Sequence, residues 1–219
     1  MKVKGGSLAA GPDWAISDRR GIQRVFDPAD AVEKSRASKL RRGEDVADFL
    51  HARWLMRHLI QQRRPQMETP VLQSYDDARP ELPRAPDVAL SWSKSGPVAA
   101  AALSGGGIVG IDIERVIARD TGAVLTMTAS GTEAAAVASA GNETAQLAAF
   151  YRLWTAKEAV LKCRGEGLRG GAKSVEIPLA FIHGRADTIT IHDRGVSLAL
   201  SVIDAGPDAV CTLAFSAQK

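Results

Sequence analysis

Residues 142–163 have the sequence NETAQLAAFYRLWTAKEAVLKC, in which apolar side chains recur every three or four positions. This spacing predicts one long helix with a buried stripe. Asn142 is a suitable N-cap residue, Glu143 follows in the first turn, and Gly165 or Gly167 ends the helix. The stripe consists of Leu147, Phe150, Tyr151, Trp154 and Leu161.

Three further helices are expected outside this segment. Asp27 is placed to cap a helix with Pro28 at its first position, and basic residues follow. A longer helix over 44–62 has its own apolar stripe, and helical signal returns at 131–140. The stripe of the longer helix contains Phe49, Leu50, Trp54, Leu55 and Leu59.

Short apolar runs separated by turn residues predict strands in the rest of the chain. Runs at 88–92, 98–103 and 108–113 predict an antiparallel meander. The remaining expected strands are 14–16, 175–177, 189–191, 196–202 and 210–215. The predicted order along the chain is helices, a meander, a helix and then further strands. This order indicates an α+β fold.

The composition is that of an ordinary globular chain of 219 residues, with 45% hydrophobic and 24% charged residues. It excludes a collagen-like, coiled-coil or disordered chain. No segment approaches the roughly 18 apolar residues of a membrane helix. Residues 1–12 predict a flexible leader without the apolar run of a signal peptide. Cys163 and Cys211 are expected to be free thiols in a reducing cytosol.

Positive charge is concentrated in the first third of the chain. Residues 19–64 contain 12 Lys and Arg against 6 Asp and Glu. Such a segment fits an anionic ligand, which can be a phosphorylated small molecule, a nucleic acid or an acidic protein. A solvated basic helix surface explains the same charge without any ligand.

Two carboxylates lie on the predicted strand with the sequence GIDIE, residues 110–114. Because side chains alternate along a strand, Asp112 and Glu114 share one face while Ile111 and Ile113 point into a core. Like charges this close need a cation between them, and oxygen ligands suit Mg²⁺. Taken alone, the pair also fits a solvated strand end beside Arg115.

A carboxylate and an amine lie at the edge of the apolar stripe of the long helix. Glu158 and Lys162 are four residues apart and therefore share one helix face. This placement suits side chains that face a cleft, although an ordinary surface ion pair has the same spacing. Residues 91–97, with the sequence SWSKSGP, form a turn that could hold a phosphate, although taken alone the segment favours an unliganded hairpin.

Taken together, GIDIE at 110–114 and WTAKEAVLK at 154–162 resemble the paired signature of the 4′-phosphopantetheinyl transferases. That signature is Gly-x-Asp-x-Glu on a strand and Trp-Ser/Thr-x-Lys-Glu-x-x-x-Lys on a helix. Arg79-Pro80 is similar to the Gly-Lys-Pro of the family, and residues 93–96 align with its Ser-His-Ser-Gly. The resemblance extends over residues 13–215 and is strongest to the larger, Sfp-type members.

The resemblance implies two similar α/β halves, each with an antiparallel sheet and a long helix, and a site at their interface. The halves would be residues 13–109 and 110–219. Such enzymes are cytoplasmic monomers that move the phosphopantetheine arm of coenzyme A to a serine of an acyl or peptidyl carrier protein. The other product is 3′,5′-ADP. Fatty-acid, polyketide and non-ribosomal peptide carriers all remain open as partners.

The family also implies roles for individual residues. Asp112, Glu114 and Glu158 would hold Mg²⁺ against the pyrophosphate. Glu158, or a water on the Mg²⁺, would take the serine proton, and Lys162 would stabilise the leaving phosphate. The resemblance assigns coenzyme A contacts to Arg36, Lys39, Arg79, Ser93, Lys94 and Lys157.

The sequence departs from the family pattern at several positions. Lys94 replaces a histidine near the 3′-phosphate and supplies a permanent charge there. Ala78 replaces a glycine, Ser91 stands where asparagine is common, and residues 125–128 lack two phenylalanines. None of these changes affects the three carboxylates or Lys162.

Two other functions are compatible with parts of the sequence. One is an inactive homologue that binds coenzyme A or a carrier, against which the intact carboxylates and Lys162 argue. The other is a basic nucleic-acid-binding module. The chain has no recognisable motif of that kind, and an aromatic content of 5% provides few side chains on which bases could stack.

Overall fold

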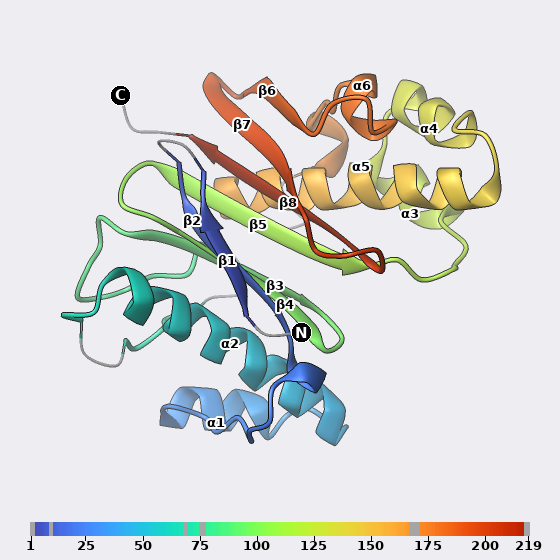
Figure 1. Ribbon diagram of the computed structural model, residues 1–219. Helices are drawn as coiled ribbons and strands as arrows, with labels where there is room; N and C mark the ends of the chain where they lie inside the picture. Colours follow the sequence, from blue (N-terminus) through green and yellow to red (C-terminus); the bar gives the residue numbers. More distant parts are fainter. Residues whose placement is uncertain (1–2, 9–10, 68–69, 75–77, 167–170, 217–219) are drawn as a thin grey trace.

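Two antiparallel four-stranded sheets form the centre of the molecule (Figure 1). The computed structural model describes residues 3–8, 11–67, 70–74, 78–166 and 171–216. The first sheet has the order β1-β2-β4-β3, formed by β1 (Lys4–Ser7), β2 (Asp13–Asp18), β3 (Ala89–Ser95) and β4 (Val98–Ser104). The second has the order β5-β8-β7-β6, formed by β5 (Ile108–Arg115), β6 (Thr188–Asp193), β7 (Val196–Ile203) and β8 (Ala209–Ser216). The predicted α+β fold with two similar halves is confirmed.

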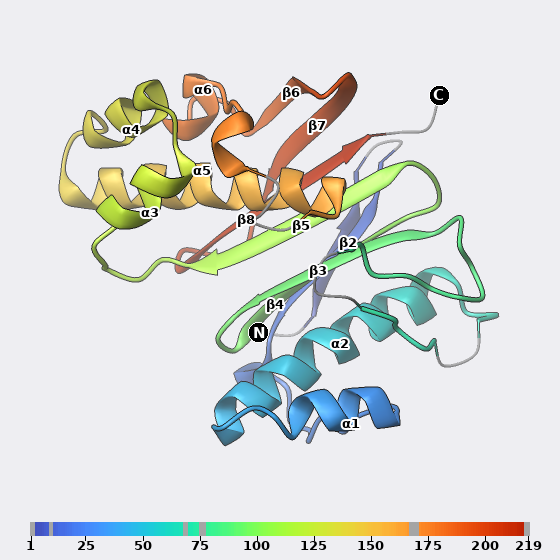
Figure 2. The ribbon, with the colours of Figure 1, turned by 180° about the vertical axis from the view of Figure 1, so that it is seen from behind.

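One long helix lies on the outer face of each sheet, as both views show (Figures 1 and 2). These are α2 (Gly43–Arg63) and α5 (Glu143–Arg164). The shorter helices are α1 (Ala31–Ala37), α3 (Gly122–Thr128), α4 (Gly131–Ala138) and α6 (Leu179–Ile182), with 3₁₀ turns η1 (Arg19–Gly21) and η3 (Ala172–Ser174). No described helix has the length and apolarity needed to span a membrane.

The ends of α5 are those the sequence predicts. The Asn142 side chain accepts a hydrogen bond from the Ala145 N–H at 3.0 Å. Gly165 ends the helix in the left-handed region with φ of 75°, a conformation that glycine adopts without strain. The alternative, Gly167, lies outside the described residues.

Two expectations for the first half are wrong. Residues 4–7 of the expected leader form β1, which pairs with β2 and supplies backbone partners along that edge. A Cβ on Gly6 would lie 3.0 Å from the Trp14 ring, so glycine leaves room for that side chain. Helix α1 is capped by Asp30 rather than Asp27, because Asp30 accepts from the Glu33 N–H at 2.8 Å.

Two expectations for the second half are also wrong. β5 does not continue the meander but pairs with β8 in the other sheet, and the predicted boundary after residue 109 falls inside β5. That boundary stays a prediction. Residues 175–177 are not a strand, because side chains take up their backbone groups. Lys157 donates to the Val175 carbonyl, and Glu133 accepts from the Ile177 N–H.

Alanines at the centre of β4 allow close packing on both faces of the first sheet. Residues 99–102 are all alanine and fully buried. Ala99 and Ala101 belong to the core under α2, whereas Ala100 and Ala102 belong to the core between the sheets. The structure is therefore layered as α2, first sheet, second sheet and α5.

Gly110 brings α5 against β5. A Cβ on Gly110 would lie 2.0 Å from the Ala159 carbonyl oxygen and 2.8 Å from the Cys163 nitrogen. Both atoms belong to the helix backbone, which cannot move aside as a flexible side chain can. Only glycine permits this close approach of the helix. The approach places the Glu158–Lys162 turn directly over the strand.

We predict that Gly110→Ala lowers the free energy of unfolding by at least about 3 kcal/mol, because the helix must move off the strand. Urea unfolding measures the change. Gly43→Ala is the control, since a Cβ at that position would have no heavy atom within 4 Å and alanine favours a helix. An unchanged unfolding midpoint in Gly110→Ala would contradict this account of the packing.

Candidate active site

The carboxylates of β5 point toward α5, as the alternation of the strand predicts. Ile111 and Ile113 are fully buried in the core between the sheets. Asp112 is buried on the opposite face, and Glu114 is half-buried there.

Lys162 reaches Asp112 from the last turn of α5. Its Nζ lies 2.7 Å from Asp112 Oδ1 and 3.0 Å from the Ile111 carbonyl oxygen. Ser93 donates a hydrogen bond to the same Oδ1 at 2.7 Å. The other oxygen, Oδ2, is buried and has no hydrogen-bond partner.

Glu158 lies one helical turn before Lys162 and has one buried oxygen, Oε1, without a hydrogen-bond partner. The pKa of Glu158 is raised to about 7, chiefly by burial and also by the charges of Asp112 and Glu114, while Lys162 opposes the increase. Burial also raises the pKa of Glu114, against a hydrogen bond from Ser95 Oγ at 2.6 Å. The three acidic side chains therefore share one electrostatic environment.

A metal site is not assembled in this arrangement. Among the described residues, no group of three or more His, Cys, Asp or Glu side chains has a geometry that would hold a metal ion. The Lys162 ammonium instead neutralises Asp112. The donor set nevertheless fits Mg²⁺, because Asp112 Oδ2 and Glu158 Oε1 are buried carboxylate oxygens that lack a hydrogen-bond partner.

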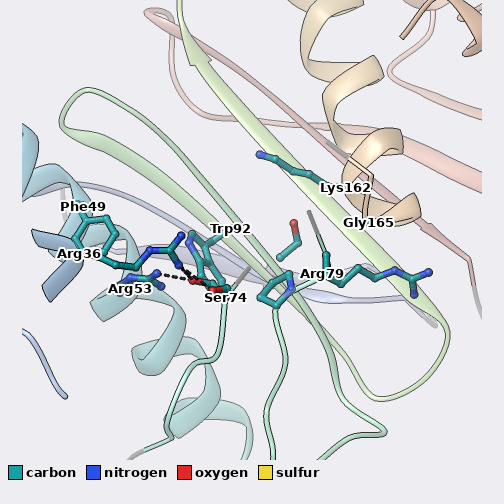
Figure 3. Close-up of a pocket in the computed structure, with 11 residues that line it drawn as sticks. Arg36, Phe49, Arg53, Ser74, Arg79, Trp92, Lys162 and Gly165 are labelled. Atoms are coloured by element: carbon teal, nitrogen blue, oxygen red, sulfur yellow. Dashed lines mark hydrogen bonds between the residues drawn. The ribbon is translucent and has the colours of Figure 1, made fainter. Parts of the chain in front are cut away.

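A cavity of about 350 Å³ lies between the two halves (Figure 3). Residues of both halves line it, including Phe49, Arg53 and Trp92 from the first half and Lys162 from α5. In Figure 3, Lys162 extends from α5 above the cavity, and the Arg36 and Arg53 side chains converge on Ser74. The cavity is therefore bordered by positive charge from both halves.

Arg36 and Arg53 converge on one hydroxyl. Arg36 Nη1 donates to the Ser74 Oγ at 2.6 Å and to its carbonyl oxygen at 2.8 Å, and Arg53 Nη2 donates to the same Oγ at 2.6 Å. Arg53 is 3% exposed, and its Nε and Nη1 have no hydrogen-bond partner. Two guanidinium groups and unused buried donors suit an anion.

Sequence reasoning missed Arg53, Ser74 and Trp92. Arg53 is held over the rings of Phe49 and Trp92, with its Cζ 4.5 and 5.2 Å from their centroids. The available signal was a charged residue inside the apolar stripe of the 44–62 helix. Ser74 gave no signal, since it lies in a proline-rich connection.

The other residues predicted to contact coenzyme A do not all lie at the cavity. Arg79 borders the cavity beside Gly165, where a Cβ would lie 2.8 Å from its Cγ. Lys39 and Lys94 are exposed and do not line the cavity. Lys94 alternates with Ser93 and Ser95 along β3 and therefore points to the opposite face.

Lys157 is not at the phosphate end, which corrects the expectation for this residue. Its side chain is 1% exposed, and its Nζ lies 2.8 Å from Glu133 Oε2. It also donates to the carbonyl oxygens of Ala172 and Val175. These three acceptors use all three N–H groups, so Lys157 joins α4, α5 and η3 instead of facing a ligand.

Comparison with known families agrees with this geometry. Residues 108–214 match the family model described as 4′-phosphopantetheinyl transferase superfamily. The match runs from the first residue of β5 into β8 and covers 107 of the 219 residues. No curated protein matches the chain.

We predict that the metal-free protein loses stability as the pH rises from 4.5 to 7 because of Glu158. The pKa of Glu158 is raised in the folded state, so the folded protein binds the proton more tightly than the unfolded chain does. Its stabilising contribution is complete below pH 4.5 and is lost as the pH rises through about 7. The loss is at most about 3 kcal/mol.

Urea unfolding at pH 5 and pH 7.5 in the presence of a chelator measures this loss. Glu158→Gln should have a smaller decrease in stability between the two pH values than the wild type. Equal decreases would mean that Glu158 titrates near its ordinary value.

Proposed function

We propose that the protein transfers the 4′-phosphopantetheine group of coenzyme A to a serine of an acyl or peptidyl carrier protein and releases 3′,5′-ADP. The observation that carries the proposal is the pair of buried oxygens without hydrogen-bond partners, Asp112 Oδ2 and Glu158 Oε1, beside the Lys162 ammonium. The superfamily match over residues 108–214 supports the same reaction.

The reaction forms a bond between the serine oxygen and the phosphorus that carries the pantetheine. The phosphorus–oxygen bond to the 3′,5′-ADP breaks. Glu158 accepts the serine proton. Lys162 stabilises the negative charge that develops on the leaving phosphate.

Asp112, Glu114 and Glu158 are the residues that would hold Mg²⁺ in this site. When bound, Mg²⁺ neutralises the pyrophosphate and orients it for in-line attack. Until then, Lys162 and Ser93 keep Asp112 in place through the hydrogen bonds described above.

The arginine end of the cavity suits the nucleotide of coenzyme A. We assign its 3′-phosphate to Arg36 and Arg53, whose donors surround Ser74. Arg79 also lines the cavity and is assigned to the nucleotide as well. Lys39, Lys94 and Lys157 receive no such role, because they lie outside the cavity.

The two-half architecture supports placing the protein with the larger, Sfp-type members, in which one chain contains both halves of the site. Here Arg36 and Arg53 come from the first half and Asp112, Glu158 and Lys162 from the second. A monomer would therefore be sufficient for activity.

We predict that the protein, coenzyme A, Mg²⁺ and an apo carrier protein give the phosphopantetheinylated carrier, detected by intact mass. Glu158→Ala should lower the rate at least about 100-fold by removing the base. A chelator should stop transfer. Glu143→Ala, an exposed glutamate in the first turn of the same helix, is the control and should keep the wild-type rate. An unchanged rate in Glu158→Ala would remove it from the chemistry.

We also predict that Arg36→Gln weakens coenzyme A binding about tenfold, because a charge-assisted hydrogen bond to the 3′-phosphate is lost. Calorimetry with coenzyme A and with 3′-dephospho-coenzyme A measures this effect, and binding of the second ligand should not change. Lys34→Gln, an exposed lysine on α1, is the control. A larger loss in Lys94→Glu than in Arg36→Gln would place the phosphate at Lys94 rather than at Arg36.

A further inference from the structure

β3 and β5 are edge strands of different sheets that lie side by side in both views (Figures 1 and 2). No backbone ladder between them is present among the described strands. Serine hydroxyls supply hydrogen bonds in its place. Ser91 Oγ accepts from the Ile111 N–H, and Ser95 Oγ accepts from the Arg115 N–H, both at 3.1 Å.

Ser91, Ser93 and Ser95 form a row that faces β5, because alternate residues of a strand share one face. We call them the serine row. The second and third members also donate to carboxylates, Ser93 to Asp112 at 2.7 Å and Ser95 to Glu114 at 2.6 Å. A hydroxyl can accept one hydrogen bond while donating another, and alanine can do neither.

Ser95 uses both capacities at once. Its oxygen is held by a backbone N–H of β5, and its hydrogen is directed to Glu114 Oε2 on the same strand. The Trp154 side chain, on α5, is also close enough to the Glu114 carboxylate to lower its pKa. Glu114 is thereby held between β3 and α5, although its side chain has three rotatable bonds.

We propose that Ser95 is a positioning residue that fixes the Glu114 carboxylate for divalent-metal binding. The inference rests on the proposed function in assigning Glu114 as a metal ligand. Residues that orient a metal ligand through a hydrogen bond typically change metal affinity by 10–100-fold when they are removed.

Ser91 provides a matched comparison within the same row. It makes the same kind of bond to a β5 backbone N–H as Ser95 does, but that bond is to Ile111 and holds no carboxylate. A purely structural role at the joint between β3 and β5 predicts similar effects of Ser91→Ala and Ser95→Ala. A positioning role predicts that only Ser95→Ala affects metal binding.

The test is a Mn²⁺ titration of the full chain without coenzyme A, with free Mn²⁺ followed by electron paramagnetic resonance. Ser95→Ala should bind about tenfold more weakly than the wild type, Ser91→Ala should bind like the wild type, and Ser95→Thr should recover most of the affinity. The urea midpoints of the two alanine variants should be similar, which separates metal binding from stability.

The transfer assay gives an independent readout. Ser95→Ala should raise the Mg²⁺ concentration needed for half-maximal rate about tenfold, with a smaller change in the rate at saturating Mg²⁺. Equal Mn²⁺ affinity of Ser95→Ala and the wild type overturns the inference, as does a wild type that binds no Mn²⁺. A wild type that binds Mn²⁺ with the expected variant pattern but transfers nothing overturns the proposed function alone.

Discussion

The contact between the backbone of α5 and the strand β5 is the constraint on which the acidic site depends. At Gly110 the helix lies so close that a single methyl group would meet the Ala159 carbonyl. This contact carries Glu158 and Lys162 to Asp112, two residues further along the strand. A greater separation would leave three acidic side chains without the ammonium that makes their burial tolerable.

Charge is organised differently at the arginines of the cavity and at the acidic site beside Lys162. Much of the positive charge of the first third is paired internally, since Glu33 lies against Arg53 and Arg57, and Arg19 pairs with Asp48. Arg53 still has donors without a hydrogen-bond partner. At the acidic site, next to Lys162, the groups that lack such partners are carboxylate oxygens. A ligand that carries an anion at one end and a metal-bound pyrophosphate at the other complements both.

Local patterns predicted much of this arrangement. The stripes of α2 and α5, the Asn142 cap and the alternation of Asp112 and Glu114 with two isoleucines depend on neighbours in sequence, and all are confirmed. Strand partners depend on distant segments, so neither the pairing of β5 with β8 nor the strand at 4–7 was predicted.

Lys157 shows at a single residue that contacts with distant segments cannot be predicted from local sequence. Helical spacing gives its angular position next to Glu158, but its partner, Glu133, lies on another helix that packs against α5 only in the folded chain. Arg53 was not predicted as a site residue because its neighbours in sequence are apolar, and those neighbours alone predict a core position.

The two cysteines give the molecule a property that suits a thiol-bearing ligand. Cys163 and Cys211 are free and buried, and burial raises the pKa of Cys163 to about 12. Disulfide exchange requires an accessible thiolate. Coenzyme A, the substrate in the proposed function, ends in a thiol, and cysteines buried in this way cannot form mixed disulfides with it.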